Sequence, residues 1–181
     1  MLLSKWILKI IGWKVTITTP DYAKCLICVA PHTSNWDFIL GELAYSSVGR
    51  KAGFLMKEAW FFWPLGYFFK AIGGIPVPKK RGSSLTEDIV KRFGASSRLV
   101  LAITPEGTRK GTAKWRHGFL YIAKDAGIPL LLGAIDYKNK TIEITTEFKP
   151  TDNIEADMRA IKDFYSKYNA KYPEKFITDY E

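Results

Sequence analysis

The sequence predicts a single-domain α/β fold, a layered structure with a mixed central sheet of about six or seven strands flanked by helices. Strand-like and helix-like segments alternate along the chain. The 181 residues, 47% of them hydrophobic, suffice for one core of ordinary size and are too few for two full domains. No internal repeat or low-complexity linker divides the chain.

The first residues, MLLSKWILKIIG, are amphipathic. At helical spacing the apolar side chains gather away from the two lysines of the segment, and they are Leu2, Leu3, Trp6, Ile7, Ile10 and Ile11. The segment is too short to span a bilayer, and no signal-peptide cleavage site follows it. We expect residues 1–12 to associate with a membrane interface ahead of a domain spanning residues 13–181; the alternative is a helix packed on its own domain.

The first part of the domain alternates strands with one helix. The runs KVTITT (14–19) and KCLICVA (24–30) are β-branched or apolar and predict strands. A Thr-Ser pair directly before the next segment can cap a helix over 35–48. The run GFLMK (53–57) predicts a third strand.

An aromatic stretch and a proline-containing stretch follow the third strand. Pro64 and Gly66 break the run AWFFWPLGYFFKAIGG into two short helical pieces. The two prolines of the following IPVPKKRG forbid a helix, so this segment is expected to be extended.

The second half continues the alternation. Residues 83–96 combine a serine cap, an acidic first turn, a basic last turn and a late glycine, which together predict a helix. The remaining strands are expected over 98–104, 128–136 and 141–148, and the remaining helices over 115–125 and 153–170.

Charge and cysteine content narrow the classes of partner. The chain has 27 Lys and Arg against 18 Asp and Glu, a net charge of +9, which favours an anionic partner such as phosphate, nucleic acid, an acidic carrier or an acidic lipid leaflet. Cys25 and Cys28 lie three residues apart on a predicted strand and so point to opposite faces, which disfavours a shared metal or a disulfide. With two Cys and two His in the chain, no metal site is expected.

Polar clusters follow two of the predicted strands. His32 and Asp37 come just after the strand 24–30, and Glu106 to Arg109 come just after the strand 98–104. Ligands of open α/β sheets bind at the carboxyl edge of the strands. We therefore expect the two clusters to meet there.

Each of the two polar clusters has a catalytic or binding interpretation and a purely structural one. Asp37 can reach back to one imidazole nitrogen of His32 and leave the other free to accept a proton; alternatively it only stabilises a helix N-terminus. The turn TPEGTR offers a hydroxyl and a guanidinium that suit phosphate oxygens; alternatively it is a capped surface turn. No G-x-S-x-G elbow and no cysteine near the histidines provides a nucleophile, so a base here has to activate a substrate group, such as a hydroxyl beside a bound phosphate.

Four blocks, HTSNWD, GGIPVPK, PEGTR and IPLLLGAI, resemble in order and spacing the motif blocks of the glycerolipid acyltransferases of the lysophosphatidic acid acyltransferase type. The resemblance implies a glycerol-3-phosphate acyltransferase-like fold, with His32 as general base and Asp37 as its orienting partner. The implied phosphate-contact residues are Glu106, Gly107, Thr108, Arg109, Lys57 and Lys79. Lys79 stands where the family commonly has an arginine, and it keeps the charge but loses the bidentate fork.

The reaction implied by the resemblance is direct transfer. His32 would deprotonate the hydroxyl of a lysophospholipid, 1-acyl-glycerol-3-phosphate first, and this oxygen would attack the thioester of acyl-CoA or acyl-carrier protein. No acyl-enzyme, metal or further cofactor is implied. We expect a cytoplasmic protein, peripheral on the inner face of the cell membrane, that meets an anionic membrane surface.

Three other functions stay open. The acceptor could be another lysolipid or an aminolipid, or it could be water, which would make the enzyme a thioesterase. A basic nucleic-acid-binding module would fit the pI near 9.5, but no RNP, helix-turn-helix or K-homology signature supports it, and no nucleic-acid partner is expected.

The aromatic stretch has two possible roles. It holds seven aromatic side chains within ten residues, Trp60, Phe61, Phe62, Trp63, Tyr67, Phe68 and Phe69. Most of them are expected to fill the core under the sheet. Because seven exceed what one short helical pair can bury, we expect some, with Trp60, Phe61, Trp63 and Phe68 as candidates, to contact an acyl chain or the membrane.

Overall fold

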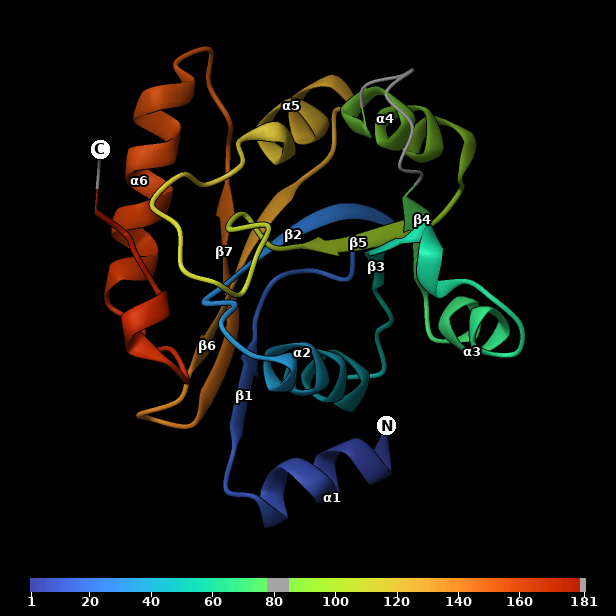
Figure 1. Ribbon diagram of the computed structural model, residues 1–181, viewed down its shortest axis with the longest axis vertical. Coiled ribbons are helices and arrows are strands. Elements are labelled where there is room, and N and C mark those ends of the chain that lie inside the picture. Colours follow the sequence, from blue (N-terminus) through green and yellow to red (C-terminus); the bar gives the residue numbers. More distant parts are fainter. Residues whose placement is uncertain (78–84, 180–181) are drawn as a thin grey trace.

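The computed structural model describes residues 1–77 and 85–179, and these form a seven-stranded sheet in the order β1-β7-β6-β2-β5-β3-β4 (Figure 1). The strands are β1 (Lys14–Ile17), β2 (Lys24–Ala30), β3 (Gly53–Lys57), β4 (Gly74–Val77), β5 (Leu99–Ile103), β6 (Leu130–Asp136) and β7 (Thr141–Phe148). The strands from β6 to β4 run parallel, β7 is antiparallel to β6, and β1 is parallel to β7. The predicted single-domain α/β fold with a mixed sheet is confirmed.

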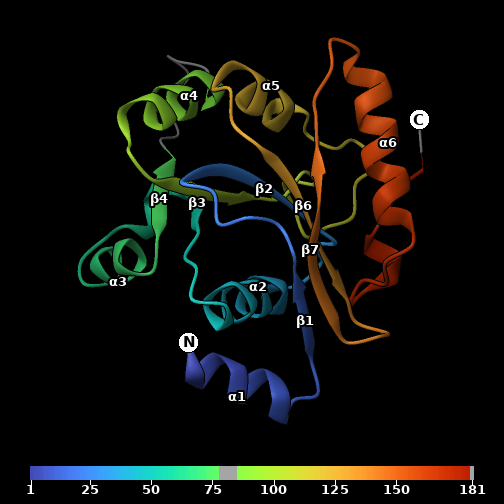
Figure 2. The same cartoon turned by 180° about the vertical axis from the view of Figure 1, so that it is seen from behind.

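Helices cover both faces of this sheet (Figures 1 and 2). They are α1 (Leu2–Ile10), α2 (Asn35–Ser47), α3 (Leu65–Ala71), α4 (Leu85–Ala95), α5 (Gly118–Asp125) and α6 (Ile154–Ser166), with short 3-10 turns at Glu58–Trp60 and Pro173–Lys175. Helices α4, α5 and α6 cover one face, α2 covers the other, and α1 lies outside α2.

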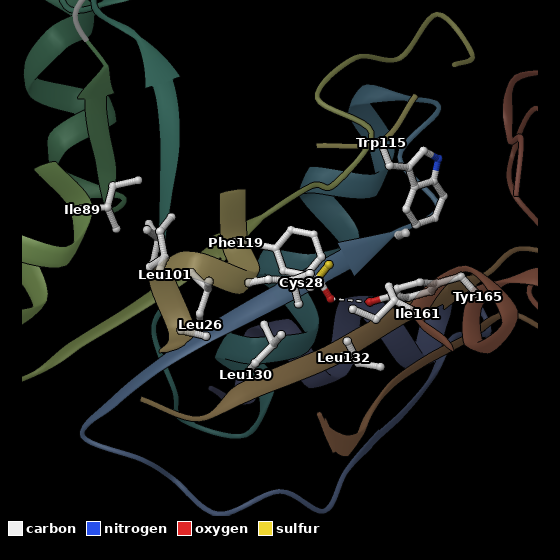
Figure 3. Close-up of a cluster of buried hydrophobic side chains, with 14 of the residues drawn as sticks. Leu26, Cys28, Ile89, Leu101, Trp115, Phe119, Leu130, Leu132, Ile161 and Tyr165 are labelled. Carbon is white, nitrogen blue, oxygen red and sulfur yellow. Dashed lines mark hydrogen bonds between the residues drawn. The ribbon is translucent and has the colours of Figure 1, made fainter. Parts of the chain in front are cut away.

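The residues of β2 alternate between the two cores. Leu26 and Cys28 face the α4–α6 side, where Figure 3 shows them among Phe119 of α5 and Tyr165 of α6. The Tyr165 hydroxyl donates a 2.6 Å hydrogen bond to the Cys28 carbonyl, which ties α6 to the sheet. Cys25 belongs to the opposite cluster, as the spacing on a strand predicts, and both cysteines are free and buried.

Two helix boundaries differ from the sequence prediction. Helix α5 begins at Gly118 because residues 105–117 form a long loop, in which the Arg116 amide donates to the Pro105 carbonyl at 2.6 Å. Helix α6 ends at Ser166, and the chain then turns back along the molecule as a tail. The serine cap expected for α4 and the residue Lys79 lie outside the described residues.

Helix α1 packs on α2 through the side that carries Ser4 and Leu8. Leu8 is buried, and the Ser46 hydroxyl donates to the Ser4 hydroxyl at 2.7 Å. The predicted apolar side stays largely exposed, at Leu2, Leu3, Trp6, Ile10 and Ile11. Among the described residues, no helix has the length and apolar character needed to cross a bilayer.

The expectation that most of the aromatic stretch fills the core is wrong. Five of its side chains are exposed, Trp60, Phe62, Trp63, Tyr67 and Phe68. Phe61 instead packs edge-on against Phe69, with ring centroids 6.1 Å apart. The stretch lies beside β4, which is the edge strand of the sheet, and these five rings stay exposed among the described residues.

Candidate active site

Three loops meet at the carboxyl edge of the sheet. Strand β2 lies between β5 and β6, and all three run parallel. The residues that follow them are therefore neighbours: His32 after β2, the 104–117 loop after β5, and Tyr137 after β6. Both Asp37 and Arg109 act electrostatically on the His32 imidazole, which places the two predicted clusters around one histidine.

The loop that carries His32 is held by the start of α2. Ser34 is the N-cap, and its hydroxyl accepts from the Trp36 amide at 3.2 Å. The Asp37 carboxylate reaches back, and its Oδ2 accepts from the Thr33 and Ser34 amides, both at 2.7 Å. This capping box confirms the predicted cap and fixes the conformation of the loop beside His32.

Asp37 lies beside the His32 ring and is 3% exposed. The distance between His32 Nδ1 and Asp37 Oδ2 is 3.7 Å. The other carboxylate oxygen, Oδ1, accepts a 2.5 Å hydrogen bond from the Tyr137 hydroxyl. Sequence reasoning missed Tyr137 because it lies 100 residues away, and only the order of the strands brings it to this site.

The environment of His32 favours a neutral imidazole. Partial burial is the main cause that lowers the His32 pKa below its usual 6.5, the positive charge of Arg109 lowers it further, and Asp37 opposes both. A neutral imidazole whose Nδ1 faces a carboxylate presents Nε2 as a proton acceptor. The arrangement can therefore act as a general base toward a group that approaches Nε2.

The loop after β5 carries Arg109, the cation that acts on this histidine. Gly107 adopts a φ of +63°, and an added Cβ would lie 3.3 Å from Arg116 Cγ, so this turn requires glycine. The Thr108 hydroxyl accepts from the Lys110 amide at 3.2 Å, and the Arg109 side chain is exposed. The predicted contact Lys57 is the last residue of β3, at the same edge of the sheet.

Glu106 is a buried acid, 4% exposed, and among the described residues neither of its carboxylate oxygens has a hydrogen-bond partner of good geometry. Burial raises the pKa of Glu106 to about 8, with a smaller rise from Asp37, while the nearby backbone of His32 lowers it. The side chain is therefore protonated at neutral pH and can donate a hydrogen bond.

Glu106→Gln is expected to stabilise the protein above neutral pH. In the folded protein Glu106 keeps its proton up to about pH 8, whereas in the unfolded chain it loses the proton near pH 4.5. The stability that the neutral acid provides is therefore full below pH 4.5 and is lost as the pH rises through 8. One pKa unit corresponds to about 1.4 kcal/mol, so the gain of the variant should grow by up to about 5 kcal/mol between pH 4.5 and 8.

Urea unfolding of wild type and variant at several pH values measures this difference. The same substitution at exposed Glu174 is the control. A free-energy difference between Glu106→Gln and wild type that stays constant across the range would show that Glu106 is ionised in the fold.

The tail after α6, residues 167–179, forms hydrogen bonds with all three loops, including one from the Tyr137 amide to the Asn169 carbonyl. The Tyr172 amide donates to the Thr33 hydroxyl at 3.3 Å, and the Trp115 indole donates to the Ile177 carbonyl at 3.0 Å. The Lys162 ammonium donates to the Ala113 carbonyl at 2.9 Å. The sequence analysis predicted a helix up to residue 170 and therefore missed the contacts between the tail and the loops.

The exposed aromatic side chains lie away from this histidine. Trp60, Trp63 and Phe68 follow β3 and precede β4, and two strands, β5 and β3, separate β4 from β2. Within residues 1–77 and 85–179, no three His, Cys, Asp or Glu side chains are grouped so as to hold a metal ion.

Comparison with known proteins gives the family. The sequence model of the family described as Acyltransferase matches residues 14–133, about two thirds of the chain. No curated protein matches the chain. The matched region contains the His32 loop, the whole 104–117 loop and the strands that bring them together. The chain therefore belongs to the acyltransferase family and is an acyl-transferring enzyme.

Proposed function

We propose that this enzyme transfers a fatty acyl group from an acyl thioester, acyl-CoA or acyl-carrier protein, to the hydroxyl of a lysophospholipid, with 1-acyl-glycerol-3-phosphate as the first acceptor to test. The main support is the pairing at one sheet edge of a neutral His32 imidazole, backed by Asp37, with the positive charge of Arg109. This pairing suits a substrate that carries a hydroxyl close to a phosphate.

The proposed reaction is a single displacement. Nε2 of His32 takes the proton of the acceptor hydroxyl as its oxygen attacks the thioester carbonyl carbon. The carbon–sulfur bond then breaks, and the departing thiolate takes the proton from the imidazolium, so the histidine returns to its neutral form. The acyl group passes directly to the acceptor without an acyl-enzyme and without a cofactor other than the donor.

Arg109 is proposed to hold the acceptor phosphate while His32 acts on the hydroxyl. Its planar guanidinium can bind two phosphate oxygens at once. Gly107 and Thr108 lie in the same turn, and the protonated Glu106 adds no negative charge that would repel the phosphate. Lys57 and Lys79 are proposed as further cations for this anion.

Peripheral binding to an anionic membrane, at the cytoplasmic face, completes the proposal. Helix α1 exposes an apolar side, and a cavity of about 520 Å³ beside it is lined by Lys5, Lys9 and Lys14 together with Trp13. The exposed aromatic residues around α3, Trp60, Trp63 and Phe68 among them, offer further rings for the interface. Exposed apolar side chains flanked by lysines are typical of helices that lie in the headgroup region.

A Trp6→Ser, Ile10→Ser variant is expected to bind anionic vesicles at least about tenfold more weakly, because each side chain contributes roughly 1.5–3 kcal/mol when fully removed from water. Co-sedimentation with vesicles of an anionic phospholipid measures this. Tyr121→Ser, an exposed aromatic residue on α5 at the other face of the sheet, is the control. Equal sedimentation of wild type and the double variant would exclude α1 as the membrane contact.

A panel of acceptors tests the proposed substrate class. Labelled donor is incubated with 1-acyl-glycerol-3-phosphate, a lysolipid with an esterified phosphate, an aminolipid, or no acceptor. We expect the diacyl product to form fastest with the phosphate monoester. Transfer only to the aminolipid would identify that acceptor instead, and free fatty acid as the sole product would identify a thioesterase.

A further inference from the structure

The turn after β6 brings Tyr137 to the side of β2 opposite the Arg109 loop. Strand β2 pairs with β5 on one side and with β6 on the other. Tyr137 directly follows the last residue of β6, so its side chain reaches the loop after β2 from that side. His32 and Asp37 are thus flanked by a cationic loop on one side and by a phenol on the other.

The contacts of Asp37 divide between its two oxygens. Oδ2 accepts from two backbone amides of its own loop, Thr33 and Ser34. Oδ1 accepts from the Tyr137 hydroxyl at 2.5 Å, a short hydrogen bond of the kind that a carboxylate forms with a hydroxyl. The amides anchor one oxygen, and the phenol fixes the plane of the carboxylate by holding the other. His32 Nδ1 lies 3.7 Å from the anchored oxygen.

Tyr137 is itself firmly placed. Its amide donates to the Asn169 carbonyl of the tail at 2.8 Å, and its ring meets Trp13 edge-on with centroids 5.1 Å apart. Asp136, the preceding residue, accepts from the Lys138 amide at 2.9 Å and closes the turn. Burial raises the pKa of the Tyr137 phenol above its usual value, so the hydroxyl keeps its proton and remains a donor.

We propose that Tyr137 is a positioning residue for the reaction, which holds the Asp37 carboxylate so that it keeps the His32 imidazole in the tautomer with its proton on Nδ1. Arg109 of the loop after β5 also acts on this ring, and Glu106 of the same loop lies near the His32 backbone. The inference rests on the proposed function of His32 as general base. Without the phenol, the carboxylate can turn about its anchored oxygen, and the imidazole loses its fixed tautomer and orientation.

Tyr137→Phe tests this proposal, because it removes the hydroxyl and keeps the ring that packs on Trp13. We expect kcat to fall roughly 10- to 100-fold with KM unchanged, as for a small misplacement of a catalytic group. Tyr22→Phe is the matched control, since it removes another phenol–carboxylate hydrogen bond, the 2.7 Å bond to Glu147, away from the site. Wild-type kcat in Tyr137→Phe would overturn the proposal.

The ¹⁵N shifts of the imidazole provide a readout that does not depend on turnover. The chain has two histidines, and His117→Gln assigns the signals. We expect the Nδ1–H tautomer alone at His32 in wild type and in Tyr22→Phe, and a mixture of both tautomers in Tyr137→Phe. An unchanged tautomer in Tyr137→Phe would overturn the proposal. If wild type transfers no acyl group, the proposed function fails, and the tautomer comparison still decides the role of Tyr137.

Discussion

His32→Ala is expected to lower kcat by about 10²–10⁴-fold, the usual contribution of a general base. The acceptor hydroxyl would then have to lose its proton to water during the attack. The ring is partly exposed and contributes little to the core, so the variant should fold and still bind its substrates. Steady-state acyl transfer measured beside thermal unfolding separates loss of chemistry from loss of structure.

The same substitution at His117 is the matched control for this prediction. His117 is exposed at the start of α5, and its ring meets Tyr121 edge-on. We expect His117→Ala to retain the wild-type rate. A folded His32→Ala enzyme with wild-type kcat would exclude His32 as the base and with it the proposed mechanism.

Arg109→Ala is expected to raise KM for a phosphate-monoester acceptor by about 10- to 100-fold, since hydrogen bonds to charged groups contribute roughly 1.5–3 kcal/mol. Arg109→Lys should recover part of the loss, because the charge remains while the bidentate fork is gone. Lys114→Ala, an exposed cation on the same loop, is the control. An equal loss with an acceptor that lacks the phosphate would contradict a phosphate-binding role for Arg109.

Arg109→Ala should also move the pH profile of kcat/KM. The positive charge of Arg109 lowers the His32 pKa, so its removal favours the protonated imidazole and raises that pKa. The base is active only when neutral, and the acid limb of the profile should therefore shift to higher pH in the variant. An acid limb that stays in place would show that the guanidinium does not act on His32 in solution.

Local sequence patterns predicted the fold and the His32–Asp37 pair because the physical causes are local. The alternation in β2 and the cap at Ser34 each depend on neighbouring residues. The Tyr137 contact depends on strand order, which no short pattern contains. The burial of the aromatic stretch was predicted wrongly. Composition gives the amount of apolar surface, whereas the burial of these rings depends on the position of the stretch beside the edge strand β4.

Release of the donor thiol, followed with and without the lysophospholipid acceptor, tests direct transfer most directly. The proposed mechanism predicts that thiol appears only when acceptor is present, in equal amount to the acylated lipid, and that no acyl group remains on the protein. Thiol released at the same rate without acceptor, or an initial burst of thiol that leaves the protein acylated, would contradict it.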